Sequence, residues 1–132
     1  MTTPSTGGCL CGQVRYELLE RAYRVCDCHC EDCRRSSGAP YVTWGIVKRG
    51  NFRVMRGEMR RIEHAGRLRS FAPCCGTPIL FEDFPGCPEL DVALATLDDP
   101  SSYRPERAIW IDDKLPWVPL DPHVRATRGT QG

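Results

Sequence analysis

Cysteines are the residues of this chain whose types and spacing most clearly indicate chemistry. There are nine in 132 residues, and most of them fall in three short clusters. In chain order these clusters hold Cys9 and Cys11; Cys26, Cys28, Cys30 and Cys33; and Cys74 and Cys75. Thiolates two or three residues apart on a tight turn can point inward together, as a tetrahedral soft-metal site requires. Because the spacings match no ferredoxin pattern, they predict zinc rather than an iron–sulfur cluster.

The first and third clusters predict a closed structural site. Cys9, Cys11 and Cys75 would supply three thiolates, and a fourth ligand would complete the tetrahedron. Adjacent cysteines chelate one ion only with local distortion, so Cys74, Cys87 and a water molecule all stay open as the fourth ligand. Such a metal would close a long loop in the chain and stabilise the fold.

The central cluster predicts a second, open site. Cys28, Cys30 and Cys33 come from one short loop, and no further ligand follows at a suitable spacing. Three protein ligands with one free position are typical of catalytic zinc. The alternative is that Cys26, Cys87 or a histidine closes this site as well.

An open all-thiolate site favours thiol chemistry over hydrolysis. Three thiolates leave a zinc complex with a formal charge of about −1, which makes it a poor Lewis acid for water. A soft, electron-rich metal is better suited to another sulfur. A thiol bound there would lose its proton below its free pKa of ~8.5 and would still react as a nucleophile.

Composition narrows the class of protein. A chain of 132 residues predicts one domain, and a net charge of +1 gives no overall electrostatic attraction to nucleic acid. Residues 1–8 contain neither the basic region nor the apolar region of a signal peptide, so we expect none, and no apolar run is long enough to span a membrane. Nine cysteines without a secretory signal argue against a disulfide scaffold. We therefore expect a cytoplasmic protein, with oligomeric state left open.

Short strands are the elements that must position these cysteines. Alternation of apolar and polar residues, with 11 prolines and 12 glycines spread along the chain, predicts a mainly β fold without a convincing amphipathic helix. We expect a flexible N-terminus over residues 1–6, one domain over residues 7–118 and a loose tail over residues 119–132. The expected strands cover residues 14–18, 23–25, 41–47, 52–55, 60–64, 68–71, 77–81, 90–94 and 108–111.

A set of motifs also carries a family resemblance. Over residues 7–117 the sequence closely resembles the glutathione-dependent formaldehyde-activating enzyme family, which includes centromere protein V. The motifs are, in order, Gly8-Cys9-Leu10-Cys11-Gly12, Cys28-His29-Cys30-Glu31-Asp32-Cys33-Arg34-Arg35-Ser36-Ser37-Gly38-Ala39-Pro40, Cys75-Gly76-Thr77-Pro78, Leu97-Asp98-Asp99-Pro100 and Ile109-Trp110.

The resemblance implies several coiled antiparallel sheets, a structural zinc on the first and third clusters, and a catalytic zinc on the central one. It also implies a carbon–sulfur lyase that joins glutathione to formaldehyde to give S-hydroxymethylglutathione. Two positions depart from the family pattern: Ala72 stands where the family usually has a cysteine, and Ala108 where it commonly has a histidine.

Substrate recognition is expected from a few residues near the central cluster. Arg34 and Arg35 could hold the carboxylates of a glutathione-like thiol, and Trp44 could line the pocket that also receives the aldehyde. A non-catalytic zinc module for interaction with other macromolecules is the alternative function. A third hypothesis is a redox or metal-buffer protein that uses Cys26 and Cys87.

Overall fold

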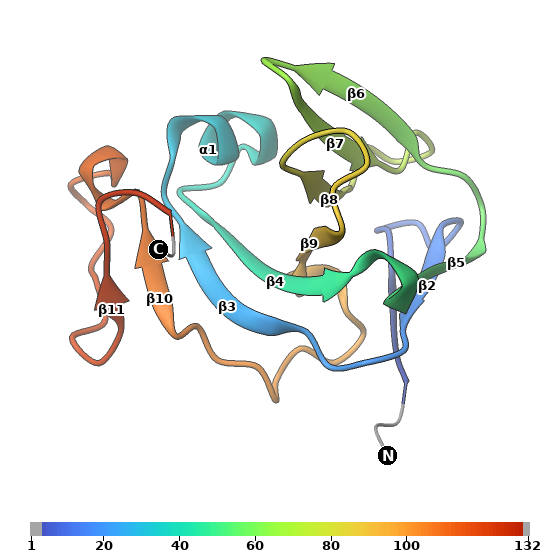
Figure 1. The fold of residues 1–132 in the computed structure, drawn as a ribbon, viewed down its shortest axis with the longest axis horizontal. Helices are drawn as coiled ribbons and strands as arrows, with labels where there is room; N and C mark the ends of the chain where they lie inside the picture. Colours follow the sequence, from blue (N-terminus) through green and yellow to red (C-terminus); the bar gives the residue numbers. More distant parts are fainter. Residues whose placement is uncertain (1–3, 131–132) are drawn as a thin grey trace.

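The computed structural model describes residues 4–130, which form eleven strands, one short α-helix and three 3₁₀ turns (Figure 1). The strands are β1 (Ser5–Gly8), β2 (Arg15–Leu18), β3 (Tyr23–Cys28), β4 (Val42–Lys48), β5 (Phe52–Arg56), β6 (Arg60–His64), β7 (Arg67–Phe71), β8 (Pro78–Glu82), β9 (Glu89–Ala93), β10 (Arg107–Ile109) and β11 (Arg125–Ala126). The helix α1 is Glu31–Ser37, and the 3₁₀ turns are Arg49–Asn51, Leu94–Thr96 and Ile111–Asp113.

Two sheets make up the domain. The smaller has the order β1-β2-β5, and the larger has the order β11-β10-β3-β4-β9-β8-β7-β6. Pairing is antiparallel except at one edge, where β10 runs parallel to both β3 and β11. A register shift between Tyr23 and Cys26 interrupts the pairing of β3 with β4, and such irregularities bend a strand. Figure 1 shows β3 and β4 curving, with α1 following at the end of β3.

The main core lies where the two sheets meet. Tyr16 and Leu18 of β2 alternate with polar neighbours and are completely buried, and Val92 of β9 is buried with them. Tyr16 stacks on Phe52 of β5 with ring centroids 4.8 Å apart. A second, smaller apolar cluster contains Cys26, Cys28, Cys33 and Trp44, so the central cysteines lie in a core of their own.

The predicted mainly β class is confirmed, and the nine predicted strands are present, most with ends shifted by one or two residues. Strand β3 runs three residues further than predicted, so Cys28 lies at the end of a strand and not in one loop with Cys30 and Cys33. The expected absence of a helix is wrong, because α1 forms directly after Cys30. Near both ends of the chain, the structure contains short strands where the sequence predicts flexible segments. Residues 5 and 6 belong to β1, and residues 125 and 126 pair with β10. Residues 1–3 lie outside the described part.

No helix between residues 4 and 130 has the length and apolar character needed to cross a membrane.

Candidate metal centres and their cavity

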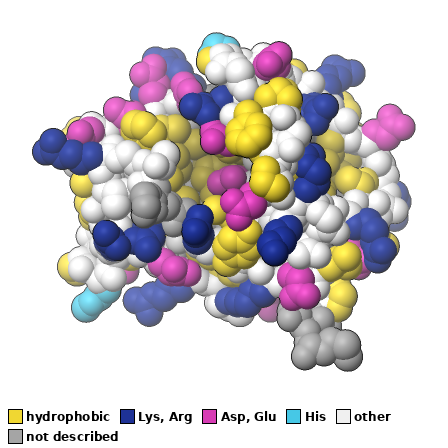
Figure 2. Space-filling view, in the orientation of Figure 1, with side chains coloured by type: hydrophobic (Ala, Val, Ile, Leu, Met, Phe, Trp, Pro, Cys, Tyr) yellow, Lys and Arg dark blue, Asp and Glu magenta, His cyan; other side chains and the backbone are white. Residues whose placement is uncertain are grey.

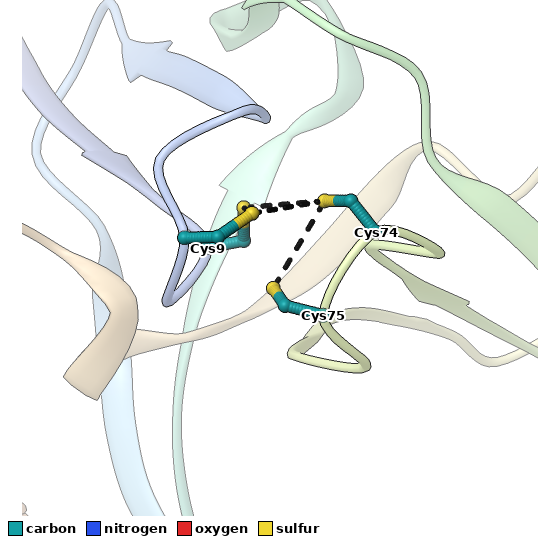
Figure 3. A group of neighbouring side chains, drawn as sticks. Cys9, Cys74 and Cys75 are labelled. Atoms are coloured by element: carbon teal, nitrogen blue, oxygen red, sulfur yellow. Dashed lines mark hydrogen bonds between the residues drawn. The ribbon is translucent and has the colours of Figure 1, made fainter.

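Four cysteine sulfurs from two distant loops meet in one group. They belong to Cys9, Cys11, Cys74 and Cys75, and all lie within 4.8 Å of one another. Cys9 Sγ is 3.8 Å from Cys11 Sγ and 3.7 Å from Cys74 Sγ, and Cys74 Sγ is 4.0 Å from Cys75 Sγ. Figure 3 shows Cys9 and the adjacent pair Cys74 and Cys75 pointing toward one another from separate loops.

The local backbone explains this convergence. Cys9 lies in a tight turn in which the Val14 amide donates to Cys9 Sγ at 3.2 Å. On the other side, the loop between β7 and β8 is closed by the Gly76 amide, which donates to the Ala72 carbonyl at 2.7 Å. Gly76 has a φ of 84°, a value that glycine adopts without strain. The Leu10 amide then joins the two loops by donating to Thr77 Oγ1 at 3.0 Å.

This group has the donor set and the spacing of a zinc site. Zn–S bonds of about 2.3 Å in a tetrahedron place sulfur atoms about 3.8 Å apart, close to the separations observed. One ligand is also prepared for ionisation: the hydrogen bond from the Thr77 hydroxyl lowers the pKa of the Cys75 thiol to about 5. The residues therefore fit a closed four-thiolate metal centre.

The structure brings Cys74 into this group and leaves Cys87 outside it. Cys87 is buried elsewhere, where its thiol donates to the Glu89 carbonyl at 3.1 Å. Ala72, at the departure from the family pattern, is fully buried at the base of the same loop. The tight turn after Ala72 is what allows two adjacent cysteines to face the same point.

The central group contains three cysteines. Cys28 ends β3, Cys30 is the N-cap of α1, and Cys33 lies in the first turn of the helix. Their sulfurs lie within 4.8 Å of one another, and Cys30 Sγ accepts a hydrogen bond from the Cys33 amide at 3.2 Å. Over residues 4–130, no fourth cysteine, histidine or carboxylate joins this group. The donor set fits a thiolate-bound metal ion with one position not filled by the protein.

Two further side chains approach Cys33. Trp44 Nε1 donates to Cys33 Sγ at 3.4 Å, and Arg69 Nη2 lies 4.0 Å from the same sulfur. Arg69 is held in place by Ser36 Oγ at 3.0 Å and by the ring of Phe81, whose centroid is 4.8 Å from the guanidinium carbon. Donors of this kind orient a metal ligand and offset its negative charge.

A cavity of about 850 Å³ opens beside the three central cysteines. Its wall includes Cys28, Cys30 and Cys33, together with aromatic side chains and charges of both signs. Figure 2 shows a hollow near the middle of this face, with hydrophobic and acidic side chains in it and basic side chains around it. A volume of this size accommodates a ligand of peptide dimensions.

Asp91 is the most strongly perturbed carboxyl group in the cavity wall. Burial, followed by the nearby acidic groups of Asp83 and Glu89, raises the pKa of Asp91 to about 7. Titratable groups with shifted pKa values concentrate at functional sites, because burial and like charges are what shape such sites.

Only one of the three predicted substrate-binding residues lines the cavity. Trp44 lines the cavity, whereas Arg34 and Arg35 are absent from its lining. Arg35 is exposed and pairs with Glu31 at 3.1 Å. The basic residue beside Cys33 is instead Arg69 of β7.

The remaining candidates lie outside both metal groups. Cys26 is buried and is paired with Trp44 across β3 and β4, and burial raises the pKa of its thiol to about 12. His29 is buried with its ring centroid 4.9 Å from that of Tyr41, and it ligates neither group. None of the nine cysteines forms a disulfide.

Fold and sites together define a mainly β protein with two cysteine centres suited to binding metal. The family model described as glutathione-dependent formaldehyde-activating enzyme matches residues 4–113. The chain belongs to this family.

Comparison with solved structures supports the fold. The chain is similar to a Rhodobacter sphaeroides protein whose crystal structure was determined as a Northeast Structural Genomics target. The two are 24% identical, with a TM-score of 0.58 over 70% of this chain and 87% of the other. A search of curated proteins gave no match.

Proposed function

We propose that this protein is a carbon–sulfur lyase that joins a thiol such as glutathione to formaldehyde or a related aldehyde. The observation that carries the proposal is the difference between the two cysteine groups. One group has four sulfurs, whereas the group with three sulfurs lies in the wall of the cavity. A protein that used both metals only for stability would have no need of an open position beside a cavity.

The reaction needs one new bond and one proton transfer. The sulfur–carbon bond forms as the carbonyl π bond of the aldehyde breaks, and the proton lost by the thiol ends on the new hydroxyl oxygen. A zinc ion held by Cys28, Cys30 and Cys33 would supply an open position at which a thiol loses its proton near neutral pH. The family name is the support for glutathione and formaldehyde as the pair.

The surrounding residues have roles that follow from their contacts. Trp44 donates to Cys33 Sγ and Arg69 places a positive charge beside it, so both offset the negative charge of several thiolates. The rings of Trp44 and Phe81 lie 6.0 Å apart in the cavity wall and give the side of the cavity near Cys33 an apolar surface. A thiolate centre of this kind needs a reducing compartment, so we place the reaction in the cytoplasm.

The test is the rate of hemithioacetal formation from glutathione and formaldehyde, followed by NMR exchange spectroscopy. Zinc-loaded wild type should accelerate it, and Cys30→Ser should remove the acceleration. Cys26→Ser is the matched control, because Cys26 lines the same cavity outside the metal group, and it should keep the activity. No acceleration with any thiol–aldehyde pair would remove the proposal and leave a non-catalytic zinc module.

A further inference from the structure

The floor of the cavity contains a carboxylate that the proposed reaction does not use. Alternate residues of β9 face the cavity, so Glu89 and Asp91 line it while Leu90 and Val92 are buried on the other face. In the sheet, Asp91 is paired with Ile46 of β4 and with Phe81 of β8. Its neighbours across the two adjoining strands are therefore apolar, and the charged groups closest to it, Asp83 and Glu89, carry the same sign.

Two other carboxylates of the wall have partners within the protein. Asp83 forms an ion pair with Arg67, and Glu89 accepts a hydrogen bond from the Tyr23 hydroxyl. Asp91 has neither a hydrogen bond nor an ion pair to any side chain in the described residues 4–130. Asp91 is therefore a charged position of the cavity wall that the protein itself leaves unmatched.

An unmatched carboxylate in this place favours a cationic ligand. Removal from water disfavours the ionised form, which is why the pKa of Asp91 rises to about 7. A cation beside it would restore the ionised form and recover the interaction that water no longer supplies. A protonated amine on the substrate has the required charge and hydrogen-bond donors.

The sheet register sets the size of a ligand that reaches both Asp91 and the cysteines. Cys28 is paired with Val42 of β4, whereas Asp91 is paired with Ile46, four residues further along the same strand. Strand β9 lies two strands from β3. With a rise of ~3.4 Å per residue and a strand spacing of ~4.8 Å, the two backbone positions are roughly 17 Å apart along the sheet. A small aminothiol cannot span this gap, but a peptide-sized thiol can.

We propose that Asp91 is a specificity-determining residue, which binds the protonated amine of a peptide-sized thiol whose sulfur lies at Cys28, Cys30 and Cys33. The position of the substrate sulfur at the central cysteines rests on the proposed function, whereas the binding of the substrate amine by Asp91 rests on the cavity wall alone. The substrate class is therefore a thiol with a primary ammonium group several bonds away from sulfur.

Calorimetric titration of the zinc-loaded protein can test the amine end by itself. The two probes are S-methylglutathione, which keeps the ammonium group but has no ionisable thiol, and its N-acetyl derivative, which lacks the positive charge. Wild type should bind the ammonium form about tenfold more tightly. Asp91→Asn should abolish this preference. Asp83→Asn makes the same charge change in the same cavity at a paired residue and should preserve it.

Three results would overturn the assignment of Asp91. They are equal affinity of wild type for the two probes, a preference that survives in Asp91→Asn, and no measurable binding of either probe. Equal weakening of both probes in Asp91→Asn would also reject it, because a neutral Asp91 would then be acting as a hydrogen-bond donor. Failure of the proposed function is distinct, since it appears as absent acceleration of the thiol–aldehyde reaction whatever the two probes do.

Discussion

Replacing Cys74 and Cys75 together should cost the protein a large part of its stability. The sulfurs of Cys9 and Cys74 are separated by 65 positions in the sequence, so a metal held between them closes a long loop. The loop-closure expression used for covalent cross-links gives about 4 kcal/mol for a loop of this length. Cys74→Ser/Cys75→Ser leaves only two ligands on one turn and removes the cross-link.

The measurement is urea unfolding of zinc-loaded protein, with Cys30→Ser as the matched control. The double variant should lose about 4 kcal/mol of unfolding free energy, or roughly 12–16 °C in Tm. Cys30→Ser should lose much less, because Cys28 and Cys33 are only five positions apart and lie on adjoining elements. Equal losses in the two variants, or identical unfolding of wild type with zinc and with a chelator, would refute the reasoning.

Three further outcomes follow from the structure. The pKa of Asp91 is raised to about 7 in the folded protein from an unfolded value of about 3.9, so its contribution to stability is complete below about pH 4 and is lost as pH rises through 7. Asp91→Asn should therefore be more stable than wild type at pH 8, by at most about 4 kcal/mol in urea unfolding. Hydrogen bonds from Arg15 and then Thr6 lower the pKa of Asp98 to about 2, so Asp98→Asn should cost about 1 kcal/mol of unfolding free energy at neutral pH. The cost is small because the Asp98 side chain is 48% exposed, and in thermal unfolding it should disappear as pH falls through 2. Trp44→Phe removes a donor to a cysteine sulfur and should weaken zinc binding at the central site about tenfold in chelator competition, whereas Trp110→Phe should not.

Most strands could be predicted from the sequence because their buried faces are strictly apolar. Residues 14–18 and 90–94 alternate cleanly, since one face of each strand packs into the main core. Strands β6 and β7 pair as a hairpin through Ala65 and Gly66, which both have positive φ, and a glycine between two strand-like runs is a turn signal in the sequence.

The helix α1 was missed for a physical reason. Its seven residues have no apolar periodicity, because Cys33 is the one buried position and was interpreted as a metal ligand. Its end signals were nevertheless present. Glu31 and Asp32 occupy the first turn, and Gly38 ends the helix in the left-handed conformation.

The alternation of apolar and polar residues in the sequence could not predict which side chains line the cavity. On β7 and β9, residues opposite the apolar face, among them Arg69 and Asp91, line the cavity rather than an open surface. A polar residue on a strand looks the same in sequence whether its face borders bulk water or an enclosed space. Only the curvature of the eight-stranded sheet distinguishes the two, and curvature depends on long-range pairing.

Counting zinc per chain tests the central claim of two separate cysteine centres most directly. Elemental analysis of protein purified with zinc should give two ions per chain for wild type and one for Cys30→Ala, with the folded structure kept. One ion in wild type, two ions in the variant, or cysteines joined as disulfides would contradict the existence of one closed centre and one open centre.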